Sequence, residues 1–135
     1  MKKIIIYFAA LTLLVVSWNS FNLIRNDEES LRKKLLLNTP ITSSFSEVED
    51  YARKHDWKTV KIDKNSGFYD QRKNQCKIGK INTSGLCIVG KSYIEYDLGH
   101  YKDLMFFITS ISAFYGFDEN NNLIEIWVWK TTDSI

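Results

Sequence analysis

The side chains best suited to chemistry are two histidines, two cysteines and one pair of acids. His55 and His100 are suited to act as general bases, and a histidine can also activate a cysteine as a nucleophile. Glu95 and Asp97 alternate along a strand-like segment, so both point to one side of it, as the two acids of a hydrolase would. Alternating acids are also typical of the solvated face of a strand, and His100 follows Gly99 as a turn residue would.

Motifs that define common enzyme classes are absent from the chain. It contains no Gly-x-Ser-x-Gly, Gly-x-x-x-x-Gly-Lys-Ser/Thr, His-Glu-x-x-His or Gly-x-Gly-x-x-Gly. Cys76 and Cys87 lie eleven positions apart, which matches neither a zinc site nor a Cys-x-x-Cys redox pair. The sequence therefore predicts a protein that is not an enzyme and that uses no metal or cofactor.

The two cysteines are expected to form a disulfide. They flank a stretch of alternating apolar residues that contains the turn-forming residues Asn82 to Gly85. In an oxidising compartment, a bridge between Cys76 and Cys87 would close a short loop and stabilise the fold by about 2.5–3 kcal/mol. The alternative is two unpaired thiols, one of them buried as a small apolar side chain.

The first 25 residues have the character of a signal anchor or signal peptide. Lys2 and Lys3 precede an uncharged, largely apolar segment from Ile4 to Ile24, whose 21 residues match the roughly 20 that cross a membrane as a helix. A cleavage site after Ser17 is the alternative. The positive-inside rule places the N-terminus in the cytoplasm. We expect a single pass through a bacterial inner membrane, with residues 26–135 forming one periplasmic domain.

Charge argues against binding to nucleic acid. The chain of 135 residues has 18 Lys and Arg against 16 Asp and Glu, and Lys2 and Lys3 both precede the apolar segment. The exported part is therefore balanced at 16 basic and 16 acidic residues. A protein that binds a phosphate backbone depends on uncompensated basic surface, which this part lacks.

Two helices are predicted at the start of the exported part. Residues 26–37 carry acids early and leucines at helical spacing, and Pro40 follows them. Ser44 and Glu47 form a capping box, which predicts that a second helix begins at this point. Its apolar stripe consists of Phe45, Val48, Tyr51 and Ala52.

Four main strands are predicted at residues 58–62, 93–98, 104–117 and 123–130. The segment between the last two, residues 117–123, is rich in Asp and Asn and predicts a tight turn. The connector 63–90 has few strong apolar residues and is expected to be a loop with a minor hairpin. The fold class is therefore α+β, with two helices packed on a four-stranded antiparallel meander sheet.

Strand alternation predicts a second sheet face, opposite the helices, that carries aromatic rings among acids. If Ile124, Ile126 and Val128 face the helices, their neighbours on the last strand face away from them. The same holds for the neighbours of Ile94, Tyr96 and Leu98 on the second strand. The predicted partner-binding residues are Tyr93, Glu95, Asp97, Glu125, Trp127 and Trp129. In the alternative interpretation, the connector 63–90 covers this face and buries Trp127 and Trp129 as a second small core.

The order of these segments resembles a known architecture. An anchor, a leucine-rich helix, a helix opened by Thr-Pro-x-x-Ser-Ser-Phe-x-Glu-Val at residues 39–48 and then a sheet are similar to BamE/SmpA-like and beta-lactamase-inhibitor-like bacterial envelope proteins. Residues 112–120 and 123–133 resemble the C-terminal part of a family of short envelope proteins. The resemblance implies a helix pair on a meander sheet and a role in binding another protein. The chain lacks the lipobox cysteine of the assembly-factor relatives, which argues against an outer-membrane lipoprotein.

Two functions follow as expectations. Some small anchored proteins of the layout that this chain resembles are immunity proteins. The resemblance therefore implies, as the first expectation, a periplasmic protein that neutralises a partner toxin by binding it. The alternative is an accessory protein for assembly or structure of the envelope. A toxin-like reading frame directly upstream would separate the two, because an immunity protein is useful only beside its toxin.

Overall fold

The computed structural model describes residues 24–71, 75–78, 81–84, 87–103 and 106–134. The predicted anchor, apart from its last residue Ile24, lies outside these residues. Ile24 itself is buried in the hydrophobic core. Within the described part of the chain, no helix is both long enough and apolar enough to span a membrane.

Both predicted helices are present. Helix α2 spans Glu28–Asn38, and the side chain of its N-cap residue Asp27 accepts a hydrogen bond from the Ser30 N–H. Helix α3 spans Phe45–Lys54 and begins with the predicted capping box, in which Ser44 and Glu47 bond each other's backbone N–H groups. These local bonds satisfy donors that the first turn of a helix leaves free, which explains why the sequence located both helix starts closely.

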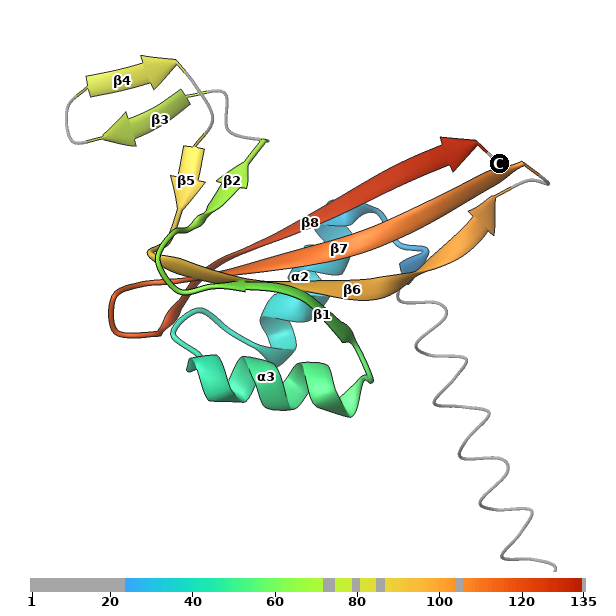
Figure 1. The fold of residues 1–135 in the computed structure, drawn as a ribbon, viewed down its shortest axis with the longest axis horizontal. Helices are drawn as coiled ribbons and strands as arrows, with labels where there is room; N and C mark the ends of the chain where they lie inside the picture. Colours follow the sequence, from blue (N-terminus) through green and yellow to red (C-terminus); the bar gives the residue numbers. More distant parts are fainter. Residues whose placement is uncertain (1–23, 72–74, 79–80, 85–86, 104–105, 135) are drawn as a thin grey trace, which may run out of the picture.

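Four antiparallel strands form the main sheet. They are β1 (Lys58–Asp63), β6 (Ser92–Asp103), β7 (Phe107–Phe117) and β8 (Leu123–Ser134). Their order in the sheet, β1-β6-β7-β8, follows the order in the chain (Figure 1). The α+β class with two helices and a four-stranded antiparallel sheet is therefore confirmed.

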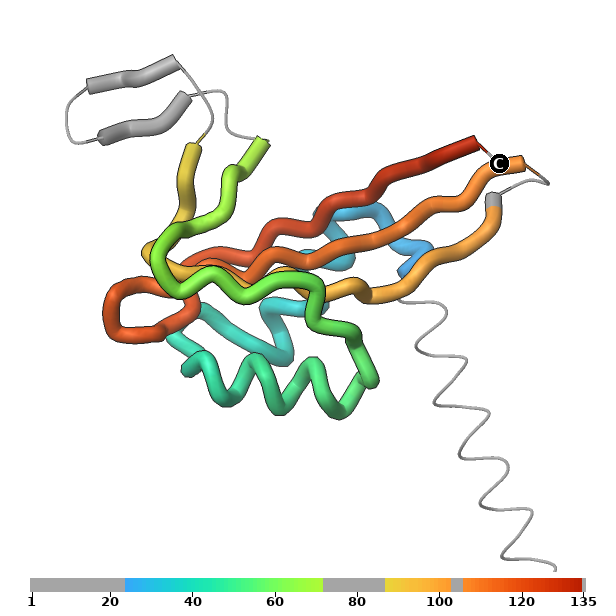
Figure 2. The backbone as a smooth tube through the Cα atoms, in the orientation of Figure 1, coloured from blue at the N-terminus to red at the C-terminus, as the bar shows by residue number. Residues whose placement is uncertain are grey.

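The connector between β1 and β6 contains two short strand pairs. Strand β2 (Phe68–Asp70) pairs with β5 (Cys87–Val89), and β3 (Gln75–Ile78) pairs with β4 (Ile81–Ser84). The predicted turn at Asn82 to Gly85 is wrong, because Asn82 to Ser84 belong to β4 and pair with β3. Figure 2 shows that β2 and β5 join the main sheet at the end where β1 finishes and β6 begins.

The main core lies between the helices and one face of the sheet. Leu31 and Leu35 of α2 and Val48 of α3 are fully buried against sheet residues such as Ile94 and Ile126. Burial of a large aliphatic side chain contributes about 1.5–3 kcal/mol, so this interface is the main source of stability.

The last strand departs from strict alternation at its start. Gly116 of β7 pairs with Glu125, whereas Phe117 pairs with Leu123, so Ile124 is an extra residue in a β-bulge. Leu123 is therefore buried, and Ile124 is 40% exposed. The prediction that Ile124 faces the helices is wrong, because a period-two pattern cannot register an inserted residue.

Helix α2 also closes the outer edge of the sheet at β8. The Arg32 Nε donates to the Ile126 carbonyl at 2.8 Å, and the Glu28 carboxylate accepts from the Lys130 N–H at 2.9 Å. These contacts occupy backbone groups that an edge strand would otherwise offer to another chain. Strand β1 forms the other edge, and most of its side chains are exposed.

Two core tyrosines should make the fold sensitive to alkali. Burial raises the pKa of Tyr96 to about 12 and raises the pKa of Tyr115 as well. The folded state therefore holds these protons more tightly than the unfolded chain, whose tyrosine pKa is near 10. We expect the free energy of unfolding to be constant just below pH 10 and to fall from pH 10 to 12. Urea unfolding at several pH values measures this dependence, and tyrosinate absorbance of the folded chain is a second readout. Titration of both tyrosines near pH 10 in the folded chain would contradict the prediction.

Candidate functional site

Residues on the sheet face opposite the helices are brought together by strand register. Lys61 of β1 pairs with Glu95 of β6, and Glu95 pairs in turn with Phe114 of β7. Phe114 pairs with Trp127 of β8, so these four residues form one row across the sheet. The next row contains Asp97, Ser112 and Trp129. Tyr93 precedes Glu95 by two positions on β6, and its partner Gly116 pairs with Glu125, so strand pairing places all six predicted binding residues in neighbouring rows of one face.

The connector covers part of this surface. Phe68 of β2 and Val89 of β5 form a second core with Tyr93, Phe114 and Trp127. The Trp127 ring stacks on Phe114 with centroids 4.9 Å apart and on Phe68 at 6.1 Å. Trp127 is 4% exposed, so of the two interpretations that the sequence left open, the one in which the connector covers this face describes Trp127.

Trp129 remains accessible. It is 38% exposed and stacks on Trp127 with centroids 5.7 Å apart and nearly parallel rings. It lines a groove of about 330 Å³ between the sheet and the end of β2. The other lining residues are Lys61, Asp63, Ser66, Gly67, Phe68, Tyr69, Gln71, Tyr93, Phe114 and Trp127. The groove therefore has an aromatic floor fixed by the second core and a polar rim.

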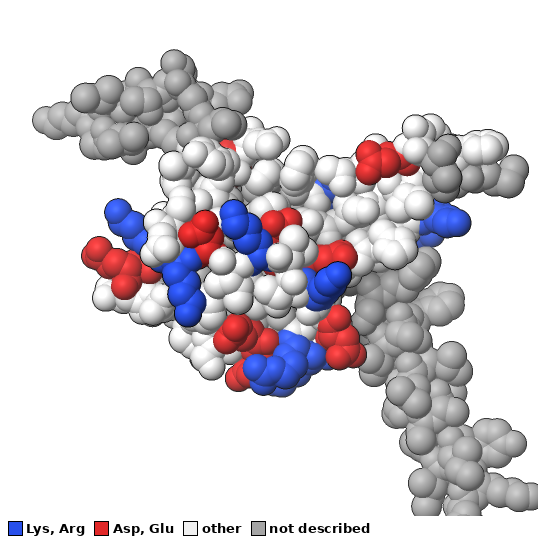
Figure 3. Space-filling view, viewed as in Figure 1, with Lys and Arg blue, Asp and Glu red and all other residues white. Residues whose placement is uncertain are grey.

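Both signs of charge occur beside the rings. The Lys61 Nζ lies 5.5 Å from the centroid of the Tyr93 ring and 3.8 Å from an Asp63 oxygen. Burial raises the pKa of Glu95, although a hydrogen bond with Ser112 and the charge of Lys61 oppose the rise. Lys and Arg are intermixed with Asp and Glu over the face of the molecule in Figure 3. Such a surface suits a partner that presents both charges around an apolar centre.

The Glu125 side chain is engaged by helix α2 and does not line the groove. Its carboxylate pairs with Arg32 of α2, with an N···O distance of 2.5 Å, and both side chains are about four-fifths buried. The Glu125 carboxylate is therefore not available among the aromatic rings as the sequence predicted. Register keeps Glu125 in the row of Tyr93 and Gly116, and its carboxylate meets Arg32 because α2 lies along the edge strand β8, which the alternation of residue types does not reveal.

Sequence reasoning missed several residues of the groove. The position of Phe114 could have been predicted from the sequence, because it alternates with the core residues Ala113 and Tyr115 on β7. Phe68 was not, because its position depends on how β2 meets β5. Gly67 permits that meeting, since a Cβ there would clash with the backbone carbonyls of Val89 and Gly90.

Cys87 of β5 is buried and disulfide-bonded. The only other cysteine of the sequence is Cys76. We therefore expect the intact chain to gain two hydrogens in mass on reduction. Thiol labelling of the denatured, unreduced chain should fail. Labelling at both cysteines would contradict the predicted Cys76–Cys87 bridge.

The histidines take separate positions. His55 caps the C-terminal end of α3, where its ring stacks on Trp57 at 5.1 Å and burial lowers its pKa. His100 is an exposed residue of β6 paired with Ser110. Among the described residues, no group of three or more His, Cys, Asp or Glu side chains is placed to hold a metal ion.

The groove offers an apolar floor, a half-exposed indole and charged groups of both signs, which together are suited to binding. Its titratable groups include Lys61 and Asp63 at the rim, and Glu95 lies in the row beside Lys61. Comparisons of the chain with protein-family models, curated proteins and solved structures give no match.

Proposed function

We propose that this chain is a membrane-anchored periplasmic protein that acts by binding another protein through the groove around Trp129. The segment 4–24 would anchor it in a bacterial inner membrane as a single pass, with Ile24, which packs in the domain core, at the junction, and residues 26–135 would form the periplasmic domain. The proposal rests on the residues quoted above for the anchor and on the groove for the binding role.

The observation that carries the binding role is the setting of Trp129. A large ring that is 38% exposed lies on a floor of packed aromatic side chains and borders a groove with a charged rim. Tryptophan is enriched among the few residues that dominate protein interfaces, and such residues lie at apolar centres surrounded by polar rims. The buried neighbour Trp127 holds the ring in place, so little side-chain entropy is lost on binding.

The most specific form of this proposal is an immunity protein that neutralises a toxin in the periplasm. The resemblance to small anchored envelope proteins favours it, and a mixed-charge rim suits recognition of a single partner. The alternative is an accessory protein for envelope assembly or structure. A chain that protects cells from a toxin encoded beside it is an immunity protein, whereas an accessory protein would give no protection.

Site-specific photo-crosslinking tests the groove directly. A photoreactive residue at position 129 of the full-length chain, produced in its own bacterium, should give one discrete adduct with a second protein. The matched control is position 124, because Ile124 lies on the same strand with a similar exposed fraction but does not line the groove. Adducts of equal yield at both positions, or an adduct only at 124, would overturn the assignment of the groove.

A further inference from the structure

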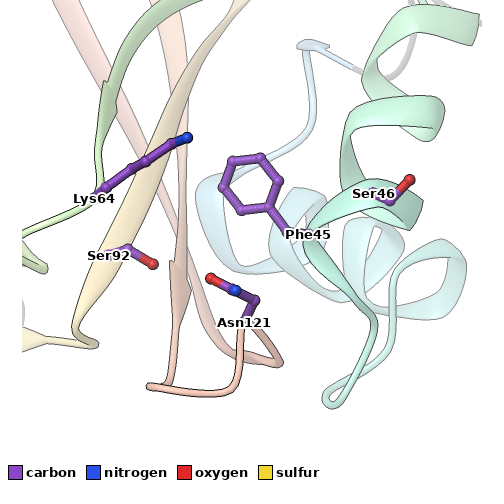
Figure 4. Close-up of a pocket in the computed structure, with 5 residues that line it drawn as sticks. All are labelled: Phe45, Ser46, Lys64, Ser92 and Asn121. Atoms are coloured by element: carbon purple, nitrogen blue, oxygen red, sulfur yellow. The ribbon is translucent and has the colours of Figure 1, made fainter.

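A second hollow lies on the opposite side of the sheet, where α3 begins. It has a volume of about 320 Å³ and is lined mainly by apolar atoms. Its lining residues are Phe45, Ser46, Lys64, Ser92 and Asn121, shown in Figure 4. They come from the start of α3, the segment after β1, the start of β6 and the turn between β7 and β8. This volume is at the small end of the range for ligand sites.

Ser92 at the base of this pocket has an unsatisfied hydroxyl. The residue is 6% exposed, and its Oγ has no hydrogen-bond partner among the described residues. A buried hydroxyl without a partner destabilises the fold, and a ligand that accepts its proton would remove that cost. In Figure 4 the Ser92 hydroxyl and the Asn121 side-chain oxygen point toward each other from two sides of the pocket. Two polar groups therefore converge on one point in an otherwise apolar hollow.

The electrostatic setting favours a negative group at that point. Lys64 extends over the pocket, and the N-terminus of α3 adds the positive end of a helix dipole. The nearby Glu47 carboxylate is already held by the Ser44 N–H and hydroxyl. The Phe45 ring packs on Phe117 with centroids 5.0 Å apart and also forms an apolar wall of the pocket.

We propose that this pocket binds a small carboxylate with an apolar body. The carboxylate would lie between the Lys64 ammonium and the Ser92 hydroxyl, which would donate to it. The apolar body would pack against the Phe45 ring. This site is separate from the groove around Trp129 and does not depend on the function proposed for that groove.

Calorimetric titration of the full-length chain with phenylacetate tests the proposal. We expect saturable binding of phenylacetate and binding of phenylacetamide that is about tenfold weaker, since the amide lacks the charge that pairs with Lys64. N-acetylphenylalanine forms a third arm. Binding tighter than that of phenylacetate would identify a polypeptide C-terminus as the source of the carboxylate, and weaker binding would identify a free small acid.

Two variants assign the binding to this pocket. Lys64→Gln should weaken phenylacetate binding about tenfold, whereas the matched control Lys58→Gln, an exposed lysine of β1, should leave it unchanged. Ser92→Ala should also weaken binding but should not lower the melting temperature, because it removes an unsatisfied polar group. Equal binding of phenylacetate and phenylacetamide, or unchanged affinity in Lys64→Gln and Ser92→Ala, would overturn the proposal.

Discussion

Replacing Trp127 with alanine is expected to lower the free energy of unfolding by about 3–5 kcal/mol. The indole is 4% exposed and contacts rings on both sides of the second core. Its loss leaves a cavity between the sheet and the connector that these packed rings cannot easily close. Phe68 would lose the stacking partner that holds β2 against the sheet.

Trp129→Ala is the matched control for this stability measurement. The two residues are two positions apart on β8 and their rings stack, but Trp129 is 38% exposed. We expect its loss to cost about 1 kcal/mol in urea unfolding, because much of its surface is already in contact with water. Similar costs for the two variants, or a cost below about 1 kcal/mol for Trp127→Ala, would show that the second core does not stabilise the fold.

The parts of the fold that the sequence predicted are those determined by neighbouring residues. The capping box at Ser44 and Glu47 locates the start of α3 because both of its bonds are local. Strand β6 and the turn before β8 follow from alternation and from turn-forming residues, among them Asn121, which adopts a positive φ of 59°. The α+β class follows once two helices and four strands share one apolar face.

Features set by contacts between distant segments were not predictable in this way. The bulge at Ile124 arises from pairing between β7 and β8, and it reverses the direction expected for that residue. Glu125 meets Arg32 only because α2 lies along the edge of β8. Burial of Trp127 requires Phe68, which comes from a connector whose composition suggested a loop.

This division also explains which predicted surface residues remain accessible. Alternation placed Tyr93, Glu95, Asp97 and Trp129 on one face, since each lies in a regular part of its strand. The same alternation contains no information on what covers that face. The connector covers part of this face, so that a groove forms beside the covered part. Of the aromatic residues predicted to bind a partner, Trp129 is the one that stays substantially exposed there.

Trp129→Ala should weaken binding of the crosslinked partner about thirtyfold, which corresponds to about 2 kcal/mol. A bound partner would remove the exposed part of the ring from water, and the stack on Trp127 presents that part in a fixed orientation. The polar rim, including Lys61 and Asp63, would exclude water around it. The loss should appear mainly as faster dissociation, because the substitution leaves the charges that steer the encounter unchanged.

Ile124→Ala is the control that separates loss of this contact from a general effect of truncating β8. Ile124 has nearly the same exposed fraction as Trp129, on the same strand, but lies outside the groove. Affinity should therefore be unchanged in Ile124→Ala, and both variants should unfold within about 1 kcal/mol of the parent chain. If Trp129→Ala binds as tightly as the parent while remaining folded, the partner is recognised elsewhere. The exposed edge of β1 is then the next surface to test, because β8, the opposite edge, is already covered by α2.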